Sequence, residues 1–499
     1  MPRIRPFPRL IMQFLRQLVS PTLSVTRLIL ISAFFFTVFY NLAFFRNSHE
    51  IYGVSPGGWA FLGSLAVFLF AVTALLLSLL CFRYTTKPVL IFLALGAAAA
   101  NYFMYRFNIV VDTTMLTNMA KTDTREVADL MSVGFVVQFL LLGVLPAILI
   151  LRTNIQWQRT GIEIKSRLKL IGGALLLMVL CLAPFTSYYT SFAREHKLLR
   201  YYANPVTFVY SGIKFLKGTV AEPSGPRQAL GRDARIPAED VDRELIILVV
   251  GEAARADHFS LNGYARDTNP LLARENVISY SDVTSCGTAT AYSVPCMFSL
   301  IPRENFDLDT AKRRENVLDV LTHAGVQVLW RDNNSDSKGV AAGVTFEDFR
   351  DPKLNPVCDV ECRDIGMLSG LDDYIAAHPT GDIVIVLHQM GNHGPAYYKR
   401  YPKEFEVFTP ACQSAELANC TDAEIINAYD NALRYTDYFL AEVIAFLRRH
   451  DDRFETAMLY MADHGESLGE NGIYLHGLPW LMAPKAQKNP GGIFWFGER

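Results

Sequence analysis

Long apolar runs dominate the first part of the chain. Five of them are long enough to cross a membrane as helices and carry almost no charge: residues 28–45, 59–81, 89–105, 134–151 and 168–185. Buried helices of a water-soluble core would be fewer and would hold more charged side chains. We therefore expect an N-terminal transmembrane domain of five helices over residues 1–186.

Basic residues between these runs orient the predicted helices. The chain before residue 28 holds five arginines and no acid, and the loops at residues 82–88 and 152–167 are also rich in Arg and Lys. Such loops mark the cytoplasmic side of a membrane, so an odd number of spans places the rest of the chain outside. A cleaved signal peptide is disfavoured, because no small-residue cleavage site follows the first run and further spans come next.

The next segment, residues 187–240, links this domain to the remainder. Residues 192–216 are rich in Tyr, Phe and Lys, which suits a helix at the membrane interface or a bridging helix of a soluble domain. Pro205 is expected to break any helix there. Residues 221–240 combine Pro, Gly and mixed charge, a composition typical of a linker.

From residue 241 onward, short apolar runs alternate with helical patterns. The predicted strands are residues 245–250, 326–330, 383–387 and 456–461, and the predicted helices are residues 314–324 and 421–449. This alternation predicts a doubly wound α/β domain over residues 241–499. The 499-residue chain has a net charge of −2, which gives no reason to expect a nucleic-acid partner.

Candidate metal ligands follow two of the predicted strands. Glu252 comes just after residues 245–250, and Asp463 and His464 come just after residues 456–461. In open α/β sheets, ligands bind at the carboxyl ends of strands, and carboxylate and imidazole groups suit zinc. An N-cap acid or a turn histidine explains one such residue alone, but two strand ends favour a shared metal site.

A hydroxyl-rich stretch between two cysteines, residues 286–296, supplies candidate nucleophiles. Thr290 is expected near the start of a helix, where backbone N–H groups and the helix dipole favour an anion. A threonine hydroxyl needs a base or a metal to become a nucleophile. Thr288 and Ser293 lie in the same stretch, and spacing alone does not choose among the three.

Cysteine usage agrees with an oxidising compartment for the C-terminal part. Cys81 and Cys181 lie in predicted membrane helices. The other six form close pairs in the sequence: Cys286 with Cys296, Cys358 with Cys362, and Cys412 with Cys420. The pattern is typical of disulfides in the periplasm, while a zinc–thiolate interpretation fits none of the common finger spacings.

Four motifs together resemble one known family. They are Val250-Gly251-Glu252, residues 285–298, Gly391-Asn392-His393-Gly394-Pro395, and residues 462–477. They are similar to those of the lipid A phosphoethanolamine transferases, which include the mobile colistin-resistance enzymes and belong to the alkaline phosphatase superfamily. The resemblance runs from the first membrane segment to about Lys488. It implies a multi-pass protein of the bacterial inner membrane with a periplasmic α/β/α, sulfatase-like catalytic domain, expected to act as a monomer.

The resemblance also implies roles for individual residues. Thr290 matches the nucleophile, and Glu252, Thr290, Asp463 and His464 match the zinc ligands. Residues expected to contact the substrates, or in the case of the histidines a second metal, are His393, His476, Asn118, Thr122, Glu126, Asn334, Ser335 and Lys338. Asn118, Thr122 and Glu126 recur every fourth residue, so one helix would display them in a line. Without the resemblance, a solvated helix face explains this series equally well.

The implied reaction moves phosphoethanolamine from phosphatidylethanolamine to a lipid A phosphate through a phosphorylated Thr290, and confers polymyxin resistance. Alternatives are another lipid-linked phospho-group transferase and a sulfatase-like hydrolase, although no Cys/Ser-x-Pro-x-Arg motif surrounds Thr290. A further alternative is an inactive membrane protein. After Trp480 the sequence departs from the family pattern and resembles a truncated or frame-shifted end, so we expect one edge of the sheet to be missing.

Overall fold

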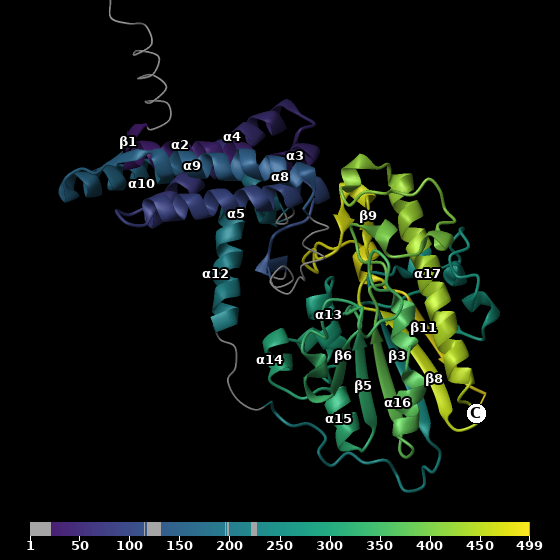
Figure 1. Ribbon diagram of the computed structural model, residues 1–499. Helices are drawn as coiled ribbons and strands as arrows, with labels where there is room; N and C mark the ends of the chain where they lie inside the picture. Colours follow the sequence, from purple (N-terminus) through teal and green to yellow (C-terminus); the bar gives the residue numbers. More distant parts are fainter. Residues whose placement is uncertain are drawn as a thin grey trace, which may run out of the picture. The chain divides into compact units, whose positions relative to one another are not determined.

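The computed structural model describes residues 21–113, 115–116, 131–194, 196, 199–220 and 227–498. They form two compact units, which are treated separately: a helical unit that ends near residue 214, and an α/β unit after it (Figure 1). The series Asn118, Thr122 and Glu126 lies outside the described residues.

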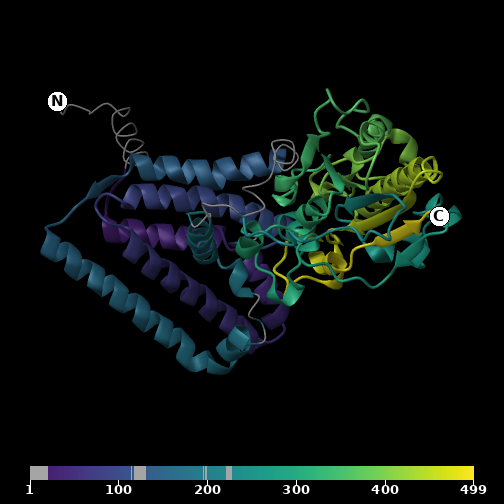
Figure 2. The ribbon, with the colours of Figure 1, turned by 90° about the horizontal axis from the view of Figure 1, so that it is seen from below.

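The helical unit contains four described helices that are long and apolar enough to cross a membrane. They are α4 (Pro56–Leu80), α5 (Thr86–Phe107), the continuous stretch Val133–Arg152, and a stretch over Thr160–Ala193 that begins with α10 (Thr160–Leu182). Figure 2 shows these helices side by side, and α10 packs along α4. The last predicted span is therefore longer than residues 168–185, because the helical conformation starts before its apolar part.

The first predicted span is not one straight helix. It consists of α2 (Val25–Phe39) and α3 (Leu42–Tyr52), which meet at an angle of 58°. Asn41 lies at the break, where its Nδ2 donates to the carbonyl oxygens of Phe36 at 3.0 Å and Asn204 at 2.7 Å. These bonds satisfy polar groups at a buried helix break. The described helices thus provide four spans, or five if the bent pair crosses once.

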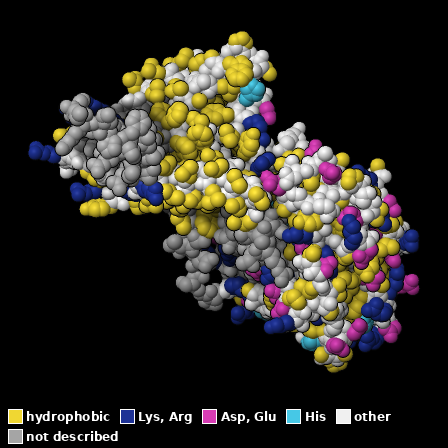
Figure 3. All heavy atoms as spheres, turned by 45° about the horizontal axis from the view of Figure 1, so that its top comes forward, with side chains coloured by type: hydrophobic (Ala, Val, Ile, Leu, Met, Phe, Trp, Pro, Cys, Tyr) yellow, Lys and Arg dark blue, Asp and Glu magenta, His cyan; other side chains and the backbone are white. Residues whose placement is uncertain are grey.

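Side-chain types differ between the surfaces of the two units. On the face drawn in Figure 3, apolar side chains cover most of the described surface of the helical unit, whereas acidic and basic ones are interspersed over the α/β unit. On α10 the outward side chains include Leu176, 60% exposed, and Val179, 59% exposed. An apolar outer surface of this extent suits a hydrocarbon environment.

The segment that leaves the helical unit contains short helices. They are α11 (Thr186–Arg194), a 3-10 helix (Leu199–Tyr202) and α12 (Val206–Val220). Helix α12 begins directly after Pro205, as expected for a residue that lacks a backbone N–H donor.

A seven-stranded sheet forms the centre of the α/β unit. Its strand order is β4-β11-β8-β3-β7-β5-β6, and the five strands from β8 to β6 are parallel. The bounds are β3 (Glu244–Gly251), β4 (Ile278–Tyr280), β5 (Gln327–Asp332), β6 (Thr345–Asp348), β7 (Ile383–His388), β8 (Glu455–Ala462) and β11 (Gly492–Phe496). All four predicted strands are confirmed, since each is a short apolar run buried within the sheet. The short strands β4 and β6 were not predicted.

Helices cover this sheet. They are α13 (Thr290–Met297), α14 (Leu308–Lys312), α15 (Val317–His323), α16 (Leu371–Ala377), α17 (Asp422–Arg448) and α18 (Lys485–Lys488). Val294 of α13 and Leu318 of α15 pack in one apolar core with Val250 and Trp330 of the sheet. Helix α17 lies along β8, and its N-terminus is closed by a capping box between Thr421 and Glu424. The predicted helix 314–324 is shorter than expected, because Asn316 caps α15 and starts it at Val317.

The segment after Trp480 corrects one prediction. Strand β11 pairs antiparallel with both β8 and β4, so it lies inside the sheet. Its Ile493 and Trp495 are buried, and they alternate with the less buried Phe494 and Phe496. This alternation is a strand signal that the sequence analysis overlooked. The segment after Trp480 therefore adds a strand to the sheet, where the sequence analysis expected a missing edge.

All three expected disulfides are present in the α/β unit: Cys286–Cys296, Cys358–Cys362 and Cys412–Cys420. Cys81 and Cys181 are free and buried in the helical unit. The first disulfide joins the loop before α13 to the last turn of that helix.

Candidate active site

Neighbouring parallel strands bring the candidate metal ligands together. Strands β3 and β8 pair in register up to Gly251 and Ala462, so the residues that follow them emerge at the same edge of the sheet. Glu252, Asp463 and His464 are all buried, with at most 1% of each residue exposed. The predicted convergence of two strand ends is what the structure shows.

The geometry of these three side chains fits a metal ion. Nε2 of His464 lies 3.4 Å from Oε1 of Glu252 and 3.3 Å from Oδ2 of Asp463. Within the described part of the chain, both of those carboxylate oxygens are buried without a hydrogen-bond partner. Buried unpaired carboxylate oxygens are unfavourable unless a cation neutralises them. Nδ1 of His464 donates to the carbonyl oxygen of Gly465 at 2.8 Å, which leaves Nε2 free to act as a ligand.

Thr290 is the first residue of α13 and faces this group. Its Oγ1 donates to Oε2 of Glu252 at 3.0 Å and lies 3.4 Å from Nε2 of His464. The other two hydroxyls of the stretch are engaged elsewhere: Thr288 donates to the carbonyl oxygen of Leu478 at 2.6 Å, and Ser293 to that of Asp463 at 2.5 Å. Of these three hydroxyls, only that of Thr290 contacts the side chains of the candidate metal ligands.

Two further histidines lie beside the first group. Glu252, His393 and His476 form a second set of potential ligands, and His464, Glu466 and His476 form a third, each with its atoms within 4.8 Å of one another. Nδ1 of His476 contacts Oε2 of Glu466 at 2.7 Å. Glu466 was missed by the sequence analysis, although its place two residues after His464 was a signal that could have found it.

The predicted head-group residues Asn334, Ser335 and Lys338 make two kinds of contact. Nδ2 of Asn334 donates to Oε2 of Glu252 at 2.9 Å and to the carbonyl oxygen of Gln389 at 2.8 Å, so this amide orients a candidate metal ligand. Nζ of Lys338 donates to Oγ of Ser335 at 2.5 Å, and Lys338 is 5% exposed.

His388 was left out of the predicted site, and the structure gives it a buried partner. Its Nδ1 lies 2.8 Å from Oδ2 of Asp332, which also accepts from Nε1 of Trp330 at 2.9 Å. Burial lowers the pKa of His388, but the Asp332 carboxylate raises it further, so the net shift is upward. Oδ1 of Asp332 accepts a hydrogen bond from the backbone N–H of Asn334 at 3.0 Å. This bond links the His388–Asp332 pair to the loop that carries the predicted head-group residues.

The charges in the site influence one another strongly. Burial raises the pKa of Glu252, but the surrounding imidazoles, led by His464, His393 and His476, bring it down to about 2. Burial and the neighbouring Glu252 carboxylate raise the pKa of Asp463. A cation between these two carboxylates would relieve their mutual repulsion.

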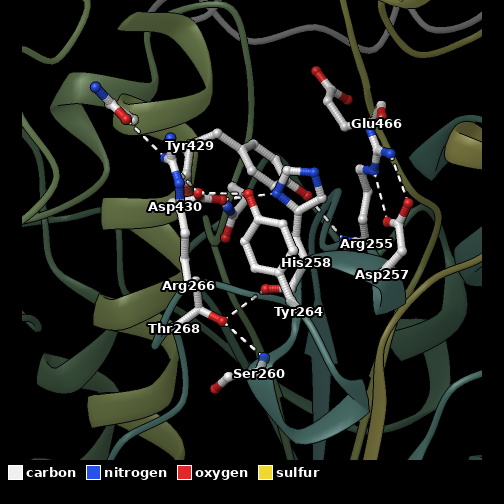
Figure 4. A network of polar contacts seen from close by, with 12 residues as sticks. Arg255, Asp257, His258, Ser260, Tyr264, Arg266, Thr268, Tyr429, Asp430 and Glu466 are labelled. Carbon is white, nitrogen blue, oxygen red and sulfur yellow. Dashed lines mark hydrogen bonds and ion pairs between the residues drawn. The ribbon is translucent and has the colours of Figure 1, made fainter. Parts of the chain in front are cut away.

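A buried polar network supports the loop that carries Glu252 (Figure 4). Tyr429 of α17 contacts the backbone of this loop, and the neighbouring Asp430 pairs with Nδ1 of His258 at 2.8 Å and with Nη1 of Arg266 at 2.9 Å. Nη1 of Arg255 donates to the carbonyl oxygen of Glu466 at 3.2 Å. The network thus connects the loop after β3 to the loop after β8.

The fold and the site together define a class of enzyme. A sheet with acidic and histidine side chains at its strand ends, and a hydroxyl at a helix start, is the arrangement of the alkaline phosphatase superfamily. The apolar helices make this a membrane-bound member. The family model of phosphoethanolamine transferases EptA and EptB matches residues 69–220, and the sulfatase model matches residues 244–498.

Comparison with known proteins identifies the family. The chain is 46% identical over 494 residues to phosphatidylethanolamine transferase Mcr-1 of Escherichia coli, covering 96% of this chain and 90% of that protein. It is 38% identical to phosphoethanolamine transferase EptA of Escherichia coli K12, covering 97% and 89%. The solved integral membrane EptA of Neisseria meningitidis superposes with a TM-score of 0.92 at 34% identity, covering 96% and 90%. The chain belongs to the phosphoethanolamine transferase family.

Proposed function

We propose that this chain transfers phosphoethanolamine from phosphatidylethanolamine to a phosphate of lipid A, and that Thr290 carries the group between the two lipids. The observation that carries the proposal is the position of Oγ1 of Thr290, 3.0 Å from Glu252 and 3.4 Å from His464 at the start of α13. The 46% identity to an enzyme named for transfer from phosphatidylethanolamine supports the donor.

We propose zinc as the metal, held by Glu252, Thr290, Asp463 and His464. Two carboxylates, an imidazole and a hydroxyl form a four-coordinate donor set that suits zinc. When bound there, zinc lowers the pKa of a coordinated hydroxyl and so favours its ionised, nucleophilic form. The buried, unpaired oxygens of Glu252 and Asp463 are the structural support for this assignment, within the residues that the structure describes.

The chain's own residues then divide the work of the reaction. Oγ1 of Thr290 loses its proton and attacks the donor phosphorus, the bond from phosphorus to the diacylglycerol oxygen breaks, and that oxygen takes up a proton. Phosphoethanolamine remains on Thr290. A phosphate oxygen of lipid A attacks the same phosphorus in the second step and frees Thr290. His393 and His476, together with the backbone N–H groups of Thr290 and Ala291 at the start of α13, are placed to stabilise charge on the phosphoryl oxygens.

Both substrates are membrane lipids, which accounts for the attachment of the catalytic domain to transmembrane helices. The protein is a multi-pass protein of the inner membrane with its catalytic domain in the periplasm, as the likeness to full-length EptA shows. The proposed ligands all come from one chain, so we propose that a monomer suffices. Added ethanolamine groups reduce the negative charge of lipid A, and a cationic polymyxin should then bind the membrane less tightly.

Mass spectrometry tests the proposal at two levels. Incubation of the purified protein with phosphatidylethanolamine, but no acceptor, should add one phosphoethanolamine mass to Thr290. In a parallel incubation with phosphatidylglycerol, a glycerol-phosphate mass on Thr290 would instead identify a different lipid-linked transferase. Lipid A from bacteria expressing the chain should gain the same phosphoethanolamine mass, and unmodified lipid A alongside an active Thr290 would show that another phosphorylated glycan is the acceptor.

A further inference from the structure

A cavity of about 210 Å³ lies in the α/β unit, beside the C-terminal end of α13. Apolar walls come from Pro295, Leu300, Ile301 and Val340, among others. Basic residues also line it: Arg227, Lys312, Arg314 and Lys338. A small cavity with apolar walls and several cationic residues suits an anionic group attached to a larger, less polar body.

The acids at this cavity already have hydrogen-bond partners within the protein. Both carboxylate oxygens of Asp319 accept from Arg227, at 2.8 and 2.9 Å. The cavity-lining Glu315 contacts Nε2 of His323 at 2.8 Å and accepts the backbone N–H of Leu230 at 2.9 Å. Neither carboxylate is therefore available to balance a further cation.

Three cations remain without an acidic partner. Among the described residues, no carboxylate oxygen lies within 4.0 Å of the side-chain nitrogens of Lys312, Arg314 or Lys338. Nε of Arg314 is buried and, within that same part of the chain, has no hydrogen-bond partner. Lys338 is 5% exposed, and its ammonium group donates to the hydroxyl of Ser335. Buried cations of this kind are stabilised by an anion that the protein itself does not provide.

Two chain segments that line the cavity are continuous with segments of the candidate active site. Pro295 lies on the same helix as Thr290, about 8 Å further along its axis at 1.5 Å per residue. Asn334, four residues before the cavity-lining Lys338, contacts Glu252 at 2.9 Å through its amide. The cavity is therefore lined in part by the helix that begins at Thr290 and by the segment that follows Asn334.

We propose that this cavity binds a second phosphate monoester of the acceptor while the first one reacts at Thr290. The inference rests on the proposed function. The donor carries one phosphate, and that phosphate must be at Thr290 when it reacts, so the donor phosphate leaves Lys312 and Arg314 unused. An acceptor disaccharide with two phosphates supplies an anion for each position. Arg314 and Lys312 are then specificity residues that favour doubly phosphorylated acceptors.

The test uses the full-length protein in detergent, fluorescent phosphatidylethanolamine as donor, and two diglucosamine acceptors, one with two phosphates and one with only the reacting phosphate. Arg314→Ala should raise the KM for the doubly phosphorylated acceptor about tenfold, because a charge-assisted contact is lost. The KM for the singly phosphorylated acceptor should not change. The rate of phosphoethanolamine addition to Thr290 should also stay the same, which verifies that the variant is folded.

Arg313→Ala is the matched control, because Arg313 is exposed and does not line the cavity. It removes the same charge one residue away and should leave both KM values unchanged. Equal effects of Arg314→Ala on the two acceptors, or no effect on either, would overturn the inference. Slower addition to Thr290 would assign the cavity to the donor phosphate and overturn it as well. A parent chain that forms no adduct would instead refute the proposed function on which the inference rests.

Discussion

The hydroxyl of Tyr429 donates to the carbonyl oxygen of Ala253 at 2.7 Å. The same hydroxyl accepts the backbone N–H of Arg255 at 2.9 Å. Ala253 has a φ of 54°, in the left-handed region that residues with a side chain rarely adopt, and it directly follows Glu252. A side chain of α17 therefore holds a strained turn that sets the direction of a candidate metal ligand.

Tyr429→Phe should lower both stability and metal affinity. It removes both hydrogen bonds and leaves two buried backbone groups unpaired, which costs about 1–3 kcal/mol for each. The turn can then relax and move Glu252 away from Asp463 and His464. Thermal unfolding and metal titration of the purified protein measure the two effects.

A second substitution separates positioning from simple loss of stability. Ala253→Gly adopts the same turn without side-chain strain, so the double variant should regain part of the metal affinity. Tyr438→Phe, on the same helix, is the control and should change neither property by much. Unchanged metal affinity in Tyr429→Phe would show that the turn holds its shape without this hydroxyl.

Thr290→Ala and Thr288→Ala should differ greatly in effect. The first removes the attacking oxygen and should lower the transfer rate by about 10⁴-fold or more, while metal remains bound through the other three ligands. The second removes only the bond to the carbonyl oxygen of Leu478 and should lower the rate by about tenfold or less. Intact-protein mass spectrometry after donor incubation checks both, and an adduct that persists in Thr290→Ala would assign the nucleophile elsewhere.

If the proposed zinc is bound, its removal should destabilise the α/β unit. Without a cation, the carboxylates of Glu252 and Asp463 repel each other in a buried site, and burial already raises the pKa of Asp463. We expect about one tightly bound zinc per chain, and a fall in the melting temperature of about 5 °C or more after EDTA treatment. Asp463→Asn should abolish this response, whereas Asp257→Asn, at an exposed acid, should retain it.

Glu244, at the start of β3, should make stability depend on pH. Burial and the neighbouring carboxyl of Asp382 raise the pKa of Glu244 to about 7, compared with about 4.5 for an ordinary glutamate. Between these values the folded chain keeps a proton that the unfolded chain has lost. The free energy of unfolding should therefore fall as the pH rises from about 4.5 to 7 and stay lower above that range.

The variant Glu244→Gln lacks this carboxyl group, so its free energy of unfolding should fall less as the pH rises. The melting temperature of the variant minus that of the parent chain should be larger at pH 8 than at pH 5. Glu442→Gln, at a helical glutamate for which the structure shows no ion pair among the described residues, serves as the control. If the melting temperatures of the parent chain and of Glu244→Gln change equally between pH 5 and pH 8, the assigned pKa of Glu244 is contradicted.

Local patterns in the sequence determined the elements and the chemical types of the site. The apolar runs that became β3, β5, β7 and β8 are continuous, because strands covered on both faces need apolar residues throughout. Ligand residues directly after such runs lie at the carboxyl edge of the sheet, which is a property of each strand by itself. The cysteines likewise paired with close neighbours in the chain.

Long-range packing decided the rest. The pairing of β3 with β8 joins Glu252 to Asp463 across more than two hundred residues, and no local signal specifies which strands become neighbours. The same packing placed β11 inside the sheet, set Asn334 against Glu252, and turned Thr290 rather than Thr288 toward the ligands. The spacing of apolar residues along a helix or strand shows which of its sides is buried. Which element packs against that side depends on how all the side chains of the core fit together.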